Sequence, residues 1–127
     1  MQKTLSLLLI EDDPTLGRLY ESLLADDGYV VTWYQSAVTA IHATLSQQFD
    51  LILLDVMLPE MSGLEALDKL GAQSRNTVML TNLDHSRIIS EIQRKGTLGH
   101  IIKSDHTPES FLMTVSDFTA KLSPYST

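Results

Sequence analysis

Five polar residues could together carry out chemistry, although they lie far apart along the chain. They offer three carboxylates, a hydroxyl and an ammonium group, on Glu11, Asp12, Asp55, Thr81 and Lys103. Carboxylates held close together repel one another, so they either raise a pKa or require a cation, and Mg²⁺ is suited to oxygen ligands. An aspartate such as Asp55 can also attack phosphorus as a nucleophile and form an aspartyl phosphate. The cation and Lys103 would then neutralise charge on the phosphoryl oxygens, and the Thr81 hydroxyl could donate a hydrogen bond to one of them.

These polar residues follow apolar runs that have the length of strands. Unbroken apolar runs of this kind are typical of parallel strands that are buried on both faces. Because parallel strands end at the same edge of a sheet, the polar residues that follow them should meet there. The predicted strands cover Leu5–Ile10, Tyr29–Tyr34, Leu51–Leu54, Thr77–Leu80 and Gly99–Ile102.

Segments with helical periodicity fill the gaps between the strands. Residues that can cap a helix N-terminus precede four of them, namely Asp13, Ser36, Asp84 and Thr107. The apolar positions expected on one face of each helix are Leu16, Leu19 and Leu23, then Val38, Ile41 and Leu45, then Leu64 and Leu67, then Ile88, Ile89 and Ile92, then Phe111, Val115, Phe118 and Leu122. Five strands alternating with five helices predict an α/β fold with a doubly wound parallel sheet. Such sheets place ligand sites at the carboxyl ends of their strands, near the switch in strand order.

Length, composition and charge exclude several classes of function. The 127 residues suit one domain, predicted over residues 1–122, with 123–127 as a tail or the start of a linker. A formal net charge of −7 argues against direct binding to nucleic acid. The chain has no cysteine, which excludes disulfides, thiolate metal sites and cysteine nucleophiles. The apolar run before Glu11 is too short for a signal peptide or a membrane span, so we expect a cytoplasmic protein without membrane contact.

The residues around the predicted site resemble a known family. The segments are LLIEDD at 8–13, DLILLDVMLPEMSG at 50–63, LT at 80–81 and IIK at 101–103. Together they resemble the receiver domains of two-component response regulators, which are CheY-like, and the resemblance spans residues 5–122. It implies a flavodoxin-like (βα)5 fold with strand order 2-1-3-4-5. It also implies a signalling switch in which Asp55 accepts a phosphoryl group from a histidine kinase or a phosphotransfer protein.

The same resemblance implies a set of Mg²⁺ ligands. Asp12 and Asp55 match direct ligands, and Glu11 matches an acid that usually acts through water. Met57 matches the position whose backbone carbonyl also binds the metal. Asp13 stands directly before Pro14 at the expected start of a helix, and we interpret it as a helix cap rather than a ligand.

Three further positions match residues that couple phosphorylation to output. Thr81 matches the switch hydroxyl and Lys103 the lysine that pairs with the phosphate, while His100 stands where receivers commonly carry a rotating aromatic side chain. The resemblance predicts that the signalling surface lies on the fourth helix, the last strand and the fifth helix. A downstream output domain or protein would bind there, and a homodimer is left open. Such a domain promotes only its own phosphorylation and dephosphorylation, so it is not an enzyme acting on separate substrates.

The sequence departs from the family pattern at several positions. Ser104 follows Lys103 where proline is usual, which predicts a trans peptide bond at that position. Asn82 replaces a small residue and His100 an aromatic one. The acidic pair of the winged-helix transcription-factor branch is here Leu98-Gly99, which argues against that branch's salt-bridged dimer.

The two positions that would orient a hydrolytic water carry apolar side chains in this chain. By resemblance they are two residues after Asp55 and two after Thr81, and here they are Met57 and Leu83. Neither side chain can hydrogen-bond a water effectively, and positioning carries much of phosphoryl-transfer catalysis. We therefore expect a long-lived phosphorylated state, which suits slow output such as gene control.

Three other functions share this architecture. A flavodoxin-type electron carrier needs a hydroxyl-rich phosphate loop, and Glu11-Asp12-Asp13 would repel a flavin phosphate. An aspartate-nucleophile phosphatase needs a general acid two residues after the nucleophile, where this chain has Met57. A degenerate receiver that acts as a constitutive docking module remains an alternative, because of Asn82, His100 and Ser104.

Overall fold

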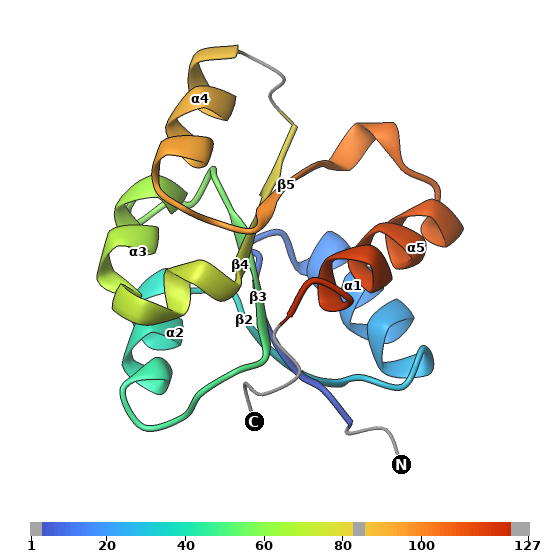
Figure 1. Ribbon diagram of the computed structural model, residues 1–127. Coiled ribbons are helices and arrows are strands. Elements are labelled where there is room, and N and C mark those ends of the chain that lie inside the picture. The colour runs from blue at the N-terminus through green and yellow to red at the C-terminus, as the bar shows by residue number, and fades with distance from the viewer. Residues whose placement is uncertain (1–3, 83–85, 123–127) are drawn as a thin grey trace.

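The computed structural model describes residues 4–82 and 86–122, which form a three-layer α/β structure around one parallel sheet (Figure 1). The strands pair in the order β2-β1-β3-β4-β5, and every pairing is parallel. Their bounds are β1 Ser6–Ile10, β2 Val30–Tyr34, β3 Leu51–Asp55, β4 Thr77–Thr81 and β5 Gly99–Ile102. The strand order reverses at β1, which runs between β2 and β3. The predicted fold class and strand order are thus confirmed.

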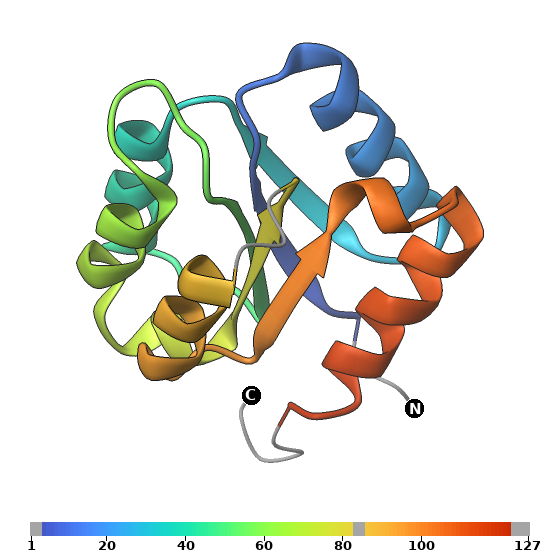
Figure 2. The same cartoon turned by 90° about the horizontal axis from the view of Figure 1, so that it is seen from above.

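Helices cover both faces of the sheet, and each face has its own apolar cluster. Figure 2 shows α2, α3 and α4 on one side and α1 and α5 on the other. The first cluster contains Ile52, Leu54 and Met79 beneath α2, α3 and α4, and the second contains Leu53 and Leu80 beneath α1 and α5. Strands β3 and β4 are buried along their whole length. Burial of both faces explains why these strands are continuous apolar runs.

The helices begin close to the predicted capping residues. Their bounds are α1 Pro14–Asp26, α2 Ala37–Thr44, α3 Gly63–Lys69, α4 Ser86–Arg94 and α5 Pro108–Thr119. The side chains of Asp13, Ser36 and Thr107 accept backbone hydrogen bonds as N-caps. Asp84, the predicted start of the fourth helix, lies outside the described residues. Two short 3₁₀ helices, η1 Gly71–Asn76 and η2 Lys103–Asp105, were not predicted.

The predicted inward faces of two helices are wrong in part. In α2, Val38 is 53% exposed and Leu45, which only caps the helix, is 77% exposed. The small residues Ala37 and Ala40 face the sheet instead, and Ile41 is partly buried. Successive residues in a helix are rotated by about 100° around the helix axis. When Ala37 packs against the sheet, Val38 therefore points away from it.

The apolar stripe of α1 is displaced in the same way. Gly17, Tyr20 and Leu24 are its buried residues, whereas Leu19 is 44% exposed. Leu16 and Leu23 are partly buried against the core as predicted, but leucine spacing did not reveal the glycine and the tyrosine that are buried on the same helix.

Two expectations about the backbone and the chain ends can be compared with the structure. No peptide bond among residues 4–82 and 86–122 is cis, so the bond between Lys103 and Ser104 is trans as predicted. No helix in the same ranges has the length and apolar character needed to cross a membrane. Residues 123–127 lie outside the described part of the chain, so the domain boundary at 122 stays a prediction.

Candidate functional site at the carboxyl edge of the sheet

The strand register brings the predicted site residues to one edge of the sheet. Ile10 pairs with Leu54, so Glu11 and Asp55, the next residue along each strand, end side by side. Asp55 in turn pairs with Leu80 on β4. Thr81, the last residue of β4, pairs with Ile102 on β5, and Lys103 follows. The four chain segments therefore converge as the parallel topology predicts.

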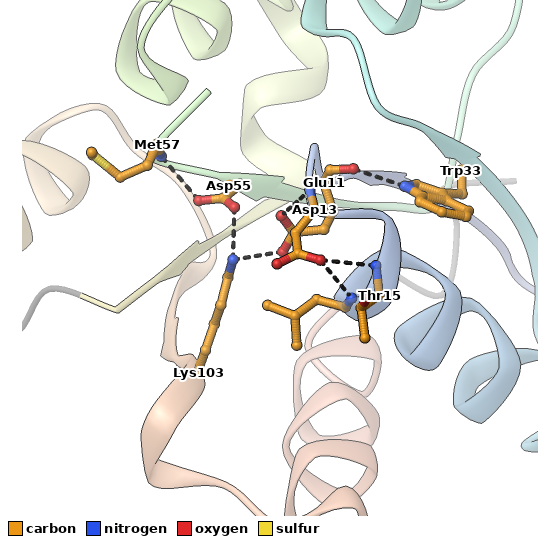
Figure 3. A network of polar contacts seen from close by, with 8 residues as sticks. Glu11, Asp13, Thr15, Trp33, Asp55, Met57 and Lys103 are labelled. Carbon is orange, nitrogen blue, oxygen red and sulfur yellow. Dashed lines mark hydrogen bonds and ion pairs between the residues drawn. The ribbon is translucent and has the colours of Figure 1, made fainter. Parts of the chain in front are cut away.

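Lys103 bridges two buried carboxylates at this edge. Its Nζ atom lies 2.5 Å from Oε1 of Glu11 and 2.6 Å from Oδ2 of Asp55 (Figure 3). The side chains of Glu11, Asp55 and Lys103 are each at most 7% exposed. Charged hydrogen bonds in such a poorly solvated place are strong, and they hold the three side chains in one geometry.

The second oxygen of Asp55 is also held. Its Oδ1 accepts a hydrogen bond of 2.9 Å from the backbone N–H of Met57, whereas the Met57 side chain is 64% exposed. Val56 N–H donates to the carbonyl of Leu80, which ties the start of the following loop to β4. At the end of that loop, an added Cβ on Gly63 would lie 2.2 Å from the carbonyl oxygen of Asp55. Glycine is required for this close approach.

Three carboxylates have the arrangement of a hard-cation site. Ligand oxygens of Glu11, Asp12 and Asp55 all lie within 4.8 Å of one another. Asp12 is only half-buried, and within the described ranges its carboxylate is the most accessible of the three. Asp13 is directed elsewhere, because its Oδ1 accepts from the backbone N–H groups of Thr15 and Leu16. The prediction that Asp13 is a cap is confirmed.

The charges at this edge do not balance. Three carboxylates face one ammonium group, which leaves two negative charges when all are ionised. Burial raises the pKa of Glu11 from 4.5 to about 7, and Asp55 adds to this rise while Lys103 opposes it. Burial alone would lower the pKa of Lys103, but hydrogen bonds and attraction from Asp55 and Glu11 outweigh it, and the pKa is raised. An oxygen-lined site with excess negative charge fits Mg²⁺.

The comparison with known proteins identifies the family. The sequence model of the response regulator receiver domain matches residues 7–113, which is most of the chain. This chain belongs to the receiver family. Receivers are the phosphorylation-dependent switches of two-component signalling, and they generally bind Mg²⁺ through acidic residues. The family match decides against the flavodoxin-type and phosphatase alternatives.

Individual relatives are regulatory proteins about twice as long as this receiver. The transcriptional regulatory protein MalR of Bacillus subtilis is 32% identical over 97% of this chain and 54% of MalR. The nitrate/nitrite response regulator protein NarL of Escherichia coli K12 is 32% identical over 94% of this chain and 56% of NarL. The chain therefore spans about half the length of these curated relatives.

Solved structures with the same fold include a receiver domain protein and a chemotaxis protein. A CheY-like receiver domain protein from Methanospirillum hungatei superposes with a TM-score of 0.85 at 21% identity, covering 94% of this chain and 96% of that one. Chemotaxis protein CheY4 of Vibrio cholerae superposes with a TM-score of 0.82 at 25% identity, covering 91% and 99%. Both agree with the sheet described above.

The receiver's remaining predicted residues lie on the β4 and β5 side of the edge. Thr81 is fully buried, whereas Asn82 directly after it is exposed. His100 is half-buried and pairs with Met79, so its side chain lies on the sheet face that α4 covers. Leu83, one of the two predicted water-orienting positions, lies outside the described residues.

Sequence reasoning missed the residues that hold the site from the β2 side. The indole N–H of Trp33 donates to the backbone carbonyl of Glu11 at 2.9 Å, and the Gln35 amide donates to that of Asp12 at 3.1 Å. Glu60, in the loop after Asp55, accepts a hydrogen bond from Ser36. No spacing rule connects these positions, since the contacts depend on how β2 lies beside β1. The one available signal was Ser36, which was predicted only as a helix cap.

Proposed function

We propose that this receiver accepts a phosphoryl group on Asp55 from a histidine kinase or a phosphotransfer protein. The observation that carries the proposal is the bridge from Lys103 to Asp55 and Glu11 at the edge of the sheet. It combines a buried carboxylate, a cation beside it and an acidic cluster that fits Mg²⁺. A carboxylate nucleophile with positive charge around it is what transfer of a phosphoryl group requires.

The residues of this chain have distinct parts in the transfer. A carboxylate oxygen of Asp55 forms a bond to phosphorus while the bond from phosphorus to the donor's imidazole nitrogen breaks, and the nitrogen keeps the electron pair. The Met57 N–H and Lys103 hold Asp55 before the reaction. Lys103 follows the negative charge onto the phosphoryl oxygens, and the Thr81 hydroxyl donates a hydrogen bond to one of them.

The acidic cluster would hold the Mg²⁺ ion. Asp12 and Asp55 would bind it directly, Glu11 through water, and Met57 through its backbone carbonyl. When bound, Mg²⁺ neutralises charge on the transferring group. Hydrolysis reverses the modification, since attack of water on phosphorus releases phosphate and restores the carboxylate. The receiver thus acts on no separate substrate.

The output surface is proposed to be the face formed by α4, β5 and α5. Thr81 and His100 lie on the two strands that lead to it, so a change at Asp55 can reach it over a short path. An output domain or protein would bind there, in the cytoplasm. The net charge of −7 disfavours direct contact with nucleic acid by this domain.

Intact mass after treatment with acetyl phosphate and Mg²⁺ tests the proposal. We expect the native chain to gain one phosphoryl group, Asp55→Asn to gain none, and the neighbouring control Asp13→Asn to be modified normally. Modification of Asp55→Asn would refute the assignment of the acceptor. A native chain that stays unmodified would instead support the degenerate docking module.

Mg²⁺ titration by calorimetry tests the ligand set separately. Asp12→Ala should weaken Mg²⁺ binding strongly. Asp13→Ala should leave binding nearly unchanged but cost about 1 kcal/mol of stability through loss of the cap. Equal losses of Mg²⁺ affinity in both variants would contradict the assignment.

A further inference from the structure

The end of β2 and the start of α2 make hydrogen bonds to the acidic turn after β1. The backbone carbonyl of Tyr34 accepts from Glu11 N–H at 3.1 Å, and the Trp33 indole N–H donates to the Glu11 carbonyl at 2.9 Å. The Gln35 amide donates to the Asp12 carbonyl at 3.1 Å. Three successive residues therefore fix the backbone of the two residues that carry the first two carboxylates. Figure 3 shows the indole lying beside this turn, on the side away from Asp55.

The same segment also reaches the loop that follows Asp55. The Ser36 hydroxyl donates to Oε2 of Glu60 at 2.8 Å, and the Ala37 N–H donates to Oε1 at 3.2 Å. Glu60 thus ties the loop after β3 to the N-terminus of α2. Residues 33–37 are therefore hydrogen-bonded to the acidic turn after β1 and to the loop that follows Asp55, although they contribute no carboxylate themselves. We refer to residues 33–37 as the β2–α2 brace.

The Trp33 ring packs directly against a glycine on α1. A Cβ added to Gly17 would lie 2.1 Å from Cζ2 and 2.6 Å from Nε1 of the Trp33 ring. Gly17 is buried in the interior of α1, where glycine is among the poorest helix formers. The packing of the indole against the helix gives a physical reason for a glycine at this position.

We infer that Trp33, as part of the β2–α2 brace, is a positioning residue of the cation site. Its indole N–H fixes the backbone carbonyl of Glu11 and thereby the acidic turn that carries two of the carboxylates. This inference rests on the proposed Mg²⁺ site. A flexible acidic turn would lose conformational freedom when it closes around a cation, and that loss weakens binding. Groups that orient ligands without touching the metal commonly affect its affinity.

Calorimetric titration with Mg²⁺ tests the role of the indole N–H. Trp33→Phe keeps an aromatic ring but removes the donor, and we expect Mg²⁺ binding about tenfold weaker. Gln35→Leu should weaken it by about fivefold, the value of one hydrogen bond. Thr119→Val is the matched control, because it deletes a 2.8 Å side-chain bond to the Ser116 carbonyl on α5. Its Mg²⁺ affinity should remain native.

Gly17→Ala gives a second route to the same site without changing the tryptophan. Its added methyl group displaces the indole, so we expect weaker Mg²⁺ binding similar to that of Trp33→Phe. Trp33→Ala removes every ring atom that the added methyl group would meet, so adding Gly17→Ala to Trp33→Ala should cause no further loss of Mg²⁺ affinity. This non-additivity, measured as a double-mutant cycle, separates positioning from a general loss of stability.

Fluorescence provides a readout in the native chain, because Trp33 is its single tryptophan. We expect Mg²⁺ to change the indole emission with the same dissociation constant that calorimetry gives, and Asp12→Ala to abolish the change. Native Mg²⁺ affinity in both Trp33→Phe and Gly17→Ala would overturn the inference. Native affinity in both Asp12→Ala and Asp55→Asn would instead overturn the proposed site itself, whatever the tryptophan variants do.

Discussion

The two sides of the site differ in how they are attached to the carboxylates. On the β2 side, Trp33 and Gln35 hold the backbone of the acidic turn, and Ser36 holds the loop after Asp55 through Glu60. On the β5 side, the Lys103 ammonium pairs with Glu11 and Asp55 from the end of a four-carbon side chain. The acidic turn is thus fixed through its backbone groups on the β2 side, whereas Glu11 and Asp55 are coupled to the β5 side through charge.

This difference indicates where a change of charge at Asp55 would be felt. A phosphoryl group adds negative charge and new acceptor oxygens, to which an ammonium or a hydroxyl can respond by moving. The backbone contacts on the β2 side do not depend on the charge of Asp55. Movement should therefore appear on the side of Thr81, Lys103 and His100.

Lys103→Met should cause the largest loss of stability, because it removes the charged link on the β5 side. Removing one partner of a buried ion pair costs roughly 3–5 kcal/mol, here because Glu11 and Asp55 are left facing each other. We expect Mg²⁺ to recover part of this loss, so that it raises the thermal midpoint more in the variant than in the native chain. Thermal unfolding with and without Mg²⁺ measures both effects.

Lys95→Met is the matched control for that prediction. Lys95 pairs with Asp68 at 2.8 Å, but Asp68 is 65% exposed, and exposed pairs contribute less than about 1 kcal/mol. If Lys103→Met loses no more stability than Lys95→Met, the account of a strong buried bridge is contradicted.

Gly63→Ala should cause the next largest loss of stability, because it disturbs the loop after Asp55, which the β2–α2 brace holds through Glu60. The new Cβ would lie 2.2 Å from the Asp55 carbonyl oxygen and 2.6 Å from Cα of Val56. Overpacking of this kind costs about 1–3 kcal/mol. Urea unfolding should show a smaller loss for Gly71→Asn, where a Cβ meets no atom within 4 Å. Equal losses would mean that the close approach at Gly63 does not matter.

The fold and the inner site could be predicted from the sequence, while the outer contacts could not. Apolar runs that stop at Glu11, Asp55 and Lys103 are local signals, and parallel topology brings their ends together. The faces of α1 and α2 were partly wrong because glycine and alanine carry little hydrophobic signal, yet they allow the closest packing. The bonds from Trp33 depend on strand order and on a helix lying beside β2, which no short stretch of sequence specifies.

Met57→Asn should have the smallest effect in energy of the three substitutions, and it should act on the lifetime of the phosphorylated form rather than on stability. Met57 is 64% exposed and its side chain cannot orient a water well. An amide in its place adds a hydrogen bond of about 1 kcal/mol, so we expect decay to be about fivefold faster. The decay is followed by intact mass after removal of acetyl phosphate. Met113→Asn, at an exposed methionine on α5, should leave the rate unchanged, and an unaltered rate in Met57→Asn would argue against water positioning there.

Hydrogen exchange before and after addition of beryllofluoride and Mg²⁺ tests the comparison of the two sides most directly. The account predicts changed protection in β4, α4, β5 and α5, little change in the β2–α2 brace, and no response in Asp55→Asn. Changes confined to α1 and α2, or an equal response in Asp55→Asn, would contradict a switch that is thrown at Asp55 and expressed on the β5 side.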